Sequence, residues 1–238
     1  MKKHIASILF LFLLSTFQLI AQSHSVKRLG IEQGLSNNYV VSITQDKQGF
    51  LWFATEEGLN KFDGTRFTTY YKNDLTQDNQ GITGNELNRV YADTKHPIIW
   101  IATQRDGLNA YNYNEQTFTA YQHNPENPHS LITNDVTDIA PSTQHDDGLW
   151  ISTYYRGIEY LDITSGQFTH YNKSTVPSLP CDQTWTVLDG GDGNLYIGHV
   201  GSGFSIFSPK DKSVKNFRNE AGNPMSLPGN DVFCIIKD

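Results

Sequence analysis

The most regular hydrophobic pattern along the chain is a short apolar strand with an aromatic residue at its second position, followed by a glycine and a second apolar run. This pattern occurs four times, and its aromatic positions are Trp52, Trp100, Trp150 and Tyr196. These anchors are 48, 50 and 46 residues apart. Recurrence at a spacing of this size is typical of a repeat protein.

Each repeat predicts four antiparallel strands joined by tight turns. The first is a short, largely β-branched run, at 40–43, 87–90, 136–139, 184–187 and 232–235, and the second carries the anchor. Asp- and Gly-containing turns join these two strands, as expected for hairpins. The third strand begins at the glycine, and the fourth alternates aromatic or Val with polar residues, at 66–70, 117–121, 167–171 and 213–217.

Four-stranded units with one aromatic anchor each predict an all-β fold, a β-propeller built of four-stranded antiparallel blades. The blades fall approximately at 36–71, 83–122, 132–172 and 180–218, with a partial unit at 228–238 that supplies the first strand of a fifth. A stacked solenoid is the alternative architecture. We expect each anchor Trp to fill the wedge between adjacent blades, with its N–H bonded locally, rather than to stack on a ligand.

The N-terminus has the features of an export signal. Met1-Lys2-Lys3 is basic, and Ile5 to Ile20 is an uncharged apolar run of 16 residues. That length suits the core of a signal peptide and is short for a membrane span. We therefore predict a signal peptide over residues 1–21 and repeats over 22–238, with an uncleaved anchor as the alternative; either way the rest of the chain is exported.

Composition and charge narrow the classes of partner. The formal net charge is −7 and no strongly basic stretch occurs, which argues against nucleic acid as a partner. Cys181 and Cys234 are too few for a disulfide framework, and whether they pair with each other stays open.

No motif in the sequence predicts catalysis, a metal site or a cofactor. Gly201-Ser202-Gly203 lacks the flanking pattern of a nucleophile elbow. Asp189 to Asn194 resembles the start of a calcium loop, but position twelve is Val200 instead of Glu. The histidines show no pair at metal-ligand spacing.

Candidate binding residues lie in the turns between the second and third strands, which in a meander share one face with the long connections between blades. Long loops on a rigid scaffold are where binding residues concentrate. The predicted ligand-binding residues are Tyr154, Tyr155, Arg156, Gln104 and Arg105. Aromatic faces stack on sugar rings, and Arg pairs with a carboxylate or sulfate. The alternative is that these side chains pack against the loop of the neighbouring blade.

The combination of motifs resembles the two component regulator propeller repeat. The resemblance rests on Leu227 to Val232, on Asp-x-x-Gly turns, on the Leu-Trp-Ile strand with its Gly-Leu pair, and on the opening Gly34 to Asn38. It covers the whole exported region and implies a seven-bladed ring whose first segment supplies the outer strand that closes it. It also implies the periplasmic sensor region of Bacteroides-type hybrid two-component histidine kinases, which sense carbohydrate breakdown products.

The resemblance implies an oligosaccharide ligand, kinase modules encoded downstream as partners, a periplasmic location and a homodimer as one assembly. No kinase is expected within this chain. Its four blades and one strand are fewer than the family ring needs, so we expect a truncated, split or partial sensor, or a small propeller. A propeller polysaccharide lyase and an envelope protein-interaction platform are the alternative functions.

Overall fold

The computed structural model describes residues 26–73 and 81–237, which form four antiparallel sheets, each of them one repeat unit or blade. The predicted signal peptide lies outside these residues. Blade 1 contains β1 (Val40–Gln45), β2 (Leu51–Thr55), β3 (Gly58–Phe62) and β4 (Phe67–Tyr70). Blade 2 contains β5 (Leu87–Ala92), β6 (Ile98–Thr103), β7 (Leu108–Asn112) and β8 (Thr117–Tyr121). Blade 3 contains β9 (Val136–Pro141), β10 (Gly148–Thr153), β11 (Gly157–Asp162) and β12 (Gln167–Tyr171). Blade 4 contains β13 (Thr184–Asp189), β14 (Leu195–His199), β15 (Phe204–Ser208) and β16 (Ser213–Phe217).

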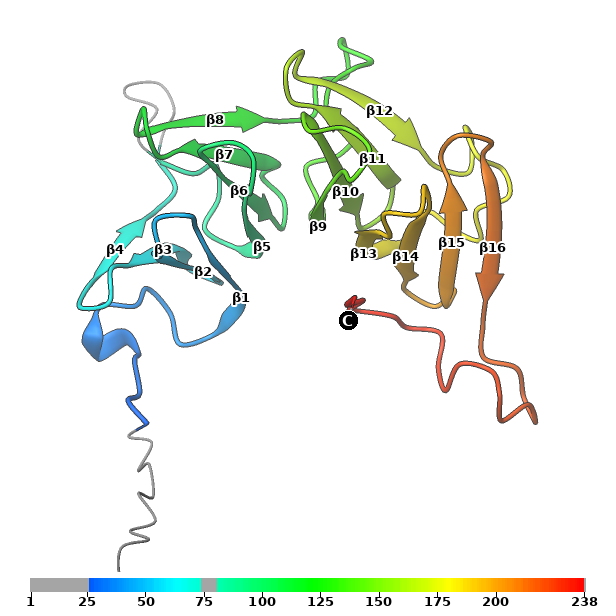
Figure 1. Ribbon diagram of the computed structural model, residues 1–238, viewed down its shortest axis with the longest axis horizontal. Helices are drawn as coiled ribbons and strands as arrows, with labels where there is room; N and C mark the ends of the chain where they lie inside the picture. Colours follow the sequence, from blue (N-terminus) through cyan, green and yellow to red (C-terminus); the bar gives the residue numbers. More distant parts are fainter. Residues whose placement is uncertain (1–25, 74–80, 238) are drawn as a thin grey trace, which may run out of the picture.

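The four blades follow one another around an open arc (Figure 1). Their first strands, β1, β5, β9 and β13, lie innermost, and their fourth strands lie outermost. This arrangement confirms the predicted all-β propeller architecture and excludes a stacked solenoid. The innermost strands extend two residues beyond the predicted runs, because the pairing continues to the start of each hairpin turn.

The hairpin between the first two strands of a blade also holds the anchor Trp. In blade 1 the Asp46 carboxylate accepts hydrogen bonds from the backbone N–H groups of Gln48 and Phe50, and from Trp52 Nε1 at 2.7 Å. Asp93 does the same in blade 2, where Trp100 Nε1 lies 3.1 Å away. One buried carboxylate therefore satisfies both the turn and the indole, which are otherwise costly to bury.

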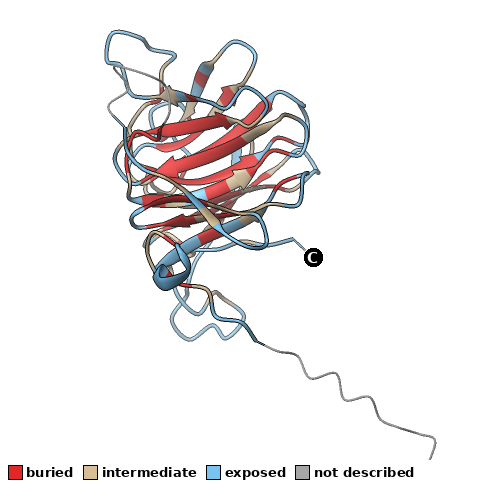
Figure 2. Ribbon diagram, turned by 90° about the vertical axis from the view of Figure 1, so that its left-hand side faces the viewer, coloured by how far each residue is buried: buried red, intermediate tan, exposed pale blue. Residues whose placement is uncertain are grey.

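The Trp anchors of blades 1 and 2 fill the wedges between blades, as predicted. Trp52 packs in one cluster with Ile99, Tyr111 and Phe118 of blade 2, and Trp100 packs with Leu149, Leu161 and Phe168 of blade 3. Both indoles are fully buried. Figure 2 shows that buried residues follow the strands, whereas the loops are exposed. The apolar core is thus divided among the interfaces between blades, and burial of these rings stabilises blade-to-blade packing.

A glycine at the start of the third strand joins each blade to the next. Gly107 N donates to Asn134 O at 2.9 Å, and the Asn134 side chain accepts from His123 N at 2.7 Å. Asn85, Asp182 and Asn230 make equivalent bonds in the other blades. The backbone O of each accepts from Gly58, Gly157 or Gly203, and its side chain accepts from the backbone N–H of a residue after the fourth strand. Gly107 has a φ of 91°, and a Cβ there would lie 2.4 Å from Tyr121 O. Glycine is required because a side chain would push the strands apart.

Two terminal segments depart from expectation. The opening segment forms a short 3-10 helix, η1 (Ile31–Gln33), and no strand; the side chains of Gln33 and Asn38 accept hydrogen bonds from Gly30 N and Ile31 N. Residues 232–235 belong to no sheet, although Val232 N donates to His199 O at 3.0 Å. The described residues hold no second strand of that unit with which they could pair.

Two smaller expectations are also resolved, on the Trp150 indole and on the two cysteines. The Trp150 indole bonds Asp189 of the next blade at 3.2 Å instead of a local group, because Ser142 occupies the place of Asp46 and Asp93. Cys181 and Cys234 are free thiols. Within residues 26–73 and 81–237, no helix has the length and apolar character needed to cross a bilayer.

Candidate functional site

The turns between second and third strands and the long connections between blades share one face, here called the loop face. Backbone hydrogen bonds join the two sets of segments. Gln104 N donates to Glu86 O at 2.8 Å, and Tyr154 N donates to Asp135 O at 3.2 Å. Glu86 and Asp135 end the long connections that enter blades 2 and 3. The predicted binding turns therefore rest on the connections that the sequence placed beside them.

A β-bulge in each innermost strand turns one side chain toward the centre of the arc. The pairing of each first strand with the second skips one position, and the skipped residues are Val41, Asn88, Thr137 and Trp185. All four line a cavity of about 400 Å³ that Phe233 and its neighbours also line. Bulges re-aim side chains in this way. Blade 4 therefore places an indole where the other blades place Val, Asn or Thr.

Trp185 connects the predicted turn to this cavity. Its ring makes an edge contact with Tyr154 at a centroid distance of 5.9 Å, and another with Phe233 at 5.4 Å. Tyr154 in turn contacts Tyr155 at 4.1 Å. We call Tyr155, Tyr154, Trp185 and Phe233 the aromatic row. It runs from the loop face into the central cavity, and edge contacts of this kind suit aromatic rings.

A second cavity, of about 450 Å³, opens beside the aromatic row. Trp185 and Tyr39 supply its aromatic walls, and Gln104 is among its polar lining residues. The carboxylates of Glu56, Glu57 and Glu86 line it as well. The volume lies in the range of small-ligand sites, which combine apolar walls with a few polar groups.

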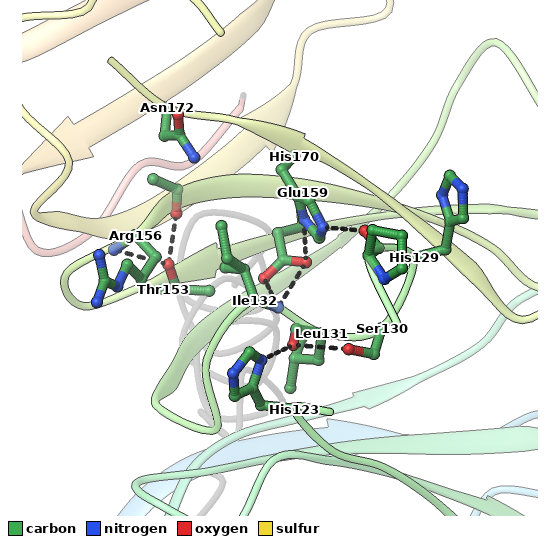
Figure 3. Close-up of polar contacts among 12 residues, drawn as sticks. His123, His129, Ser130, Leu131, Ile132, Thr153, Arg156, Glu159, His170 and Asn172 are labelled. Atoms are coloured by element: carbon green, nitrogen blue, oxygen red, sulfur yellow. Dashed lines mark hydrogen bonds and ion pairs between the residues drawn. The ribbon is translucent and has the colours of Figure 1, made fainter. Parts of the chain in front are cut away.

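The structure brings some of the predicted residues together and leaves others apart. Tyr154 is half-buried against blade 4, as the packing alternative expected, whereas Tyr155 is 54% exposed. Arg156 is exposed, and its backbone N–H donates to Thr153 Oγ1 at 3.3 Å. In Figure 3 its guanidinium points away from the buried groups of blade 3. Gln104 reaches the cavity shared with Trp185, and Arg105 is exposed on the same turn.

Sequence reasoning missed Trp185, the residue that links these groups. Its signal was present, because a large aromatic stands at a repeat position that holds Val41, Asn88 or Thr137 in the other three blades. The pattern alone treated this position as part of an ordinary strand, in which the indole would face one side of the sheet. The bulge, which directs the ring into the cavity, depends on how the two strands pair.

Blade 3 contains a buried ion pair beneath the loop face (Figure 3). Glu159 is fully buried and accepts a hydrogen bond from His170 Nδ1 at 3.0 Å and one from Ile132 N at 3.1 Å. Asn60 and Asn109 occupy the same position in blades 1 and 2 and hold the same loop through Ser36 N and Thr83 N. The Glu159 carboxylate raises the pKa of His170. The pair therefore fastens a loop and is part of the scaffold.

A buried histidine ends the anchor strand of blade 4. His199 is fully buried, and its Nε2 lies 2.8 Å from Ser205 Oγ. Burial lowers the pKa of His199 to about 4, because the charged imidazolium loses hydration there. The other blades carry Thr55, Thr103 and Thr153 at this position, and each hydroxyl bonds the carbonyl of the following glycine.

We expect the chain to lose stability as the pH falls from 6.5 to about 4. In this window the unfolded chain takes up a proton at His199 that the folded chain does not, so protonation favours unfolding. With ~1.4 kcal/mol for each unit of pKa shift, the free energy of unfolding falls by up to about 3.5 kcal/mol. Denaturant titrations at several pH values measure this loss. His199→Thr is the matched control; an equal acid sensitivity in that variant would contradict the assignment.

A cluster of metal-ligating side chains does not appear among the described residues. No group of three or more His, Cys, Asp or Glu side chains there could hold a metal ion. Asp189, which opens the loop that resembles a calcium site, instead bonds Thr143, Gly191 and the Trp150 indole. These contacts give the carboxylate a structural role in the turn and across the interface of blades 3 and 4.

Comparison with known proteins supports the family resemblance. The family model described as two component regulator propeller matches residues 34–57. The chain is 42% identical over 66 residues to histidine kinase P4 of Formosa agariphila, a match that covers 28% of this chain and 5% of that protein.

Solved structures extend the likeness over most of the chain. The extracellular domain of a hybrid two component system from B. thetaiotaomicron is 69% identical, with a TM-score of 0.82, over 89% of this chain and 28% of that one. The extracellular domain of another B. thetaiotaomicron system has a TM-score of 0.66 at 23% identity, over 81% of this chain and 27% of that one, and shows the shared fold alone. This chain thus spans about a quarter of the length of these domains.

Proposed function

We propose, on the premise that this chain is a two component regulator propeller, that it is the ligand-sensing region of a two-component signalling system outside the cytoplasmic membrane. The extracellular domain with which it shares 69% identity belongs to a hybrid two component system, and the described residues form propeller blades joined by loops. In this role the chain binds a ligand and passes the signal to a histidine kinase. The role requires the kinase and any membrane segment to be supplied by further modules.

The ligand we propose is a carbohydrate, such as an oligosaccharide released by polysaccharide breakdown. The observation that carries this proposal is the aromatic row, which leads from the exposed Tyr155 through Tyr154 to Trp185 beside a cavity of about 450 Å³. Aromatic faces pack on the C–H faces of sugar rings, and the amide of Gln104 can bond ring hydroxyls.

The charges around this cavity favour a ligand that carries hydroxyl groups at one end and an acidic substituent at the other. Glu56, Glu57 and Glu86 line the cavity, whereas Arg105 and Arg156 lie on the turns of blades 2 and 3 on the same face. Carboxylates accept hydrogen bonds from sugar hydroxyls, and a guanidinium pairs with an acidic or sulfated substituent. We therefore place the acidic end of the ligand, where it has one, over Arg105 and Arg156.

Replacing Tyr155 and Arg156 together by alanine is expected to weaken oligosaccharide binding by about tenfold or more, which corresponds to ~1.4 kcal/mol. Both side chains are exposed, so the melting temperature should change little. Calorimetric titration with defined neutral and acidic oligosaccharides measures the affinity. Trp185→Ala should weaken the same binding, because it removes the inner end of the row.

The matched control is the pair Tyr71→Ala and Arg66→Ala, an exposed tyrosine and an exposed arginine of blade 1. These substitutions should leave the affinity unchanged. Unchanged affinity in the Tyr155 and Arg156 variant, together with binding in the wild type, would remove the loop face as the site. Turnover of the oligosaccharide would instead favour a lyase.

A further inference from the structure

The wedge between blades 3 and 4 is open on the face opposite the loop face. A cavity of about 480 Å³ lies there, and Trp150, Tyr160, Tyr171, Gln144, Asp192 and Lys210 are among its lining residues. We call it the 3/4 cleft. Its residues come from the turns that the loop-face site does not use.

The residue that follows the third strand explains why the wedges between blades 1 and 2 and between blades 2 and 3 are filled on this face. Tyr113 of blade 2 packs against the cluster around Trp52, and Ile163 of blade 3 packs against the cluster around Trp100. Pairing of the strands places Pro209 of blade 4 at the same position below Trp150. Pro209 lines the cleft instead of filling it, because its ring is too small to replace Tyr or Ile.

The backbone at this position also differs. Tyr113 N donates to Pro97 O at 3.0 Å, and Ile163 N donates to Asp147 O at 2.8 Å. These bonds draw the turn after the third strand toward the hairpin turn of the same blade. Pro209 has no N–H and cannot make the equivalent bond. The two turns of blade 4 are therefore not tied together at the mouth of the cleft.

Trp150 forms an aromatic floor with two neighbouring tyrosines. Its centroid lies 4.9 Å from that of Tyr160 and 5.7 Å from that of Tyr171. The corresponding partners of Trp52 and Trp100 on the third strand are Lys61 and Ala110, so Tyr160 adds a ring that the other wedges lack. Trp150 as a whole residue is 6% exposed, whereas Trp52 and Trp100 are 0% exposed.

The charged side chains that line the 3/4 cleft are one lysine and one aspartate, so their formal charges cancel. Lys210 supplies one ammonium, and Asp192 supplies one carboxylate that is already bonded to the Tyr196 hydroxyl at 2.9 Å and to Asn194. Gln144 adds an amide at the rim and His145 adds an imidazole. A site with an aromatic floor, planar polar groups and no net charge is complementary to an uncharged ligand with one apolar face and several hydroxyls.

We propose that the 3/4 cleft is a binding site for a neutral saccharide unit, which stacks on Trp150 and Tyr160 and bonds Gln144 and Lys210. A neighbouring groove of about 560 Å³ shares Gln144, His145 and Tyr160 with the cleft and continues along blade 3. The carboxylates of Asp146, Asp147 and Asp162 line this groove and can accept hydrogen bonds from sugar hydroxyls. The site therefore accommodates a chain of more than one unit. This inference goes beyond the loop-face site, because it concerns the opposite face and different residues.

The test uses a panel of neutral trisaccharides of glucose, galactose, mannose and xylose at up to about 1 mM, the weak end of specific affinities. Binding is followed by saturation-transfer NMR and by Trp fluorescence, which should change because Trp150 forms the floor. Pro209→Tyr restores the residue of blade 2 and should abolish binding while the melting temperature stays the same or rises. Tyr160→Ala removes part of the floor without filling the cleft and should weaken binding by about tenfold.

Ile163→Tyr is the matched control, since it places the same ring at the filled wedge between blades 2 and 3. It should leave binding unchanged, as should the Tyr155 and Arg156 double variant. The inference is overturned if no member of the panel binds, or if a bound sugar is retained by both Pro209→Tyr and Tyr160→Ala. Loss of binding only in the Tyr155 and Arg156 variant would support the loop-face site and sink this one.

Discussion

Replacing Trp100 by alanine is expected to lower the free energy of unfolding by about 3–5 kcal/mol, the range for loss of a buried Trp from a core. The indole is fully buried between blades 2 and 3, where it packs with Leu108, Leu131 and Leu149. Its removal also leaves the buried Asp93 carboxylate without the indole N–H. Urea unfolding followed by fluorescence and circular dichroism measures the loss.

Tyr196→Ala is the comparison for this prediction. Tyr196 is the anchor of blade 4, but it is only half-buried, and its hydroxyl bonds the exposed Asp192. We expect a loss of about 1 kcal/mol, the ordinary size for a point substitution. Equal losses in the two variants would show that the anchors do not stabilise the fold through the inter-blade wedge.

Replacing His170 by alanine is expected to cost about 3 kcal/mol, at the lower end of the range for breaking a buried ion pair. The variant leaves the buried Glu159 carboxylate with Ile132 N as its remaining hydrogen-bond donor. The penalty is largest where Glu159 is charged and His170 carries its proton, and it shrinks as the pH rises through the raised pKa of His170. Burial raises the pKa of Glu159, so the cost should shrink as the pH falls and Glu159 takes up a proton.

The double variant Glu159→Asn with His170→Ala copies the pair that blade 2 carries, Asn109 and Ala120. It removes the buried charge and keeps an acceptor for Ile132 N, so it should recover most of the lost stability. The wild-type pair has its own pH dependence. Because the pKa of His170 is raised, its contribution is present below pH 6.5 and is lost as the pH rises through the folded value. A double variant as unstable as His170→Ala would refute the charge argument.

The propeller could be predicted from the sequence because its signals are local and repeated. The anchor strand, the Asp- or Gly-bearing turns and the alternating fourth strand each occur within a few residues, and four copies support one another. Strand boundaries therefore differed from the prediction by only about two residues in most elements. The exceptions are the two terminal segments, where the expected strand partner is missing from the described residues.

The candidate site was only partly visible in the sequence. Tyr154, Tyr155 and Arg156 were chosen because their turn differs from the other turns at that place. Their proximity to Trp185 could not be inferred, since it depends on a bulge in β13 and on the packing of blade 3 against blade 4. The hydrogen bond from Trp150 to Asp189 could not be inferred either, because it also depends on the packing of blade 3 against blade 4.

Sequence alone determined the repeat length, the four-stranded unit, the wedge role of the Trp anchors and the face on which the variable turns lie. These properties follow from the alternation of side chains along a strand and from turn chemistry, which act between near neighbours. Tertiary structure decided which residues of different blades meet. It placed Trp185 beside Tyr154 and left the wedge above Pro209 open, because bulge register and packing between blades join residues that lie far apart in the chain.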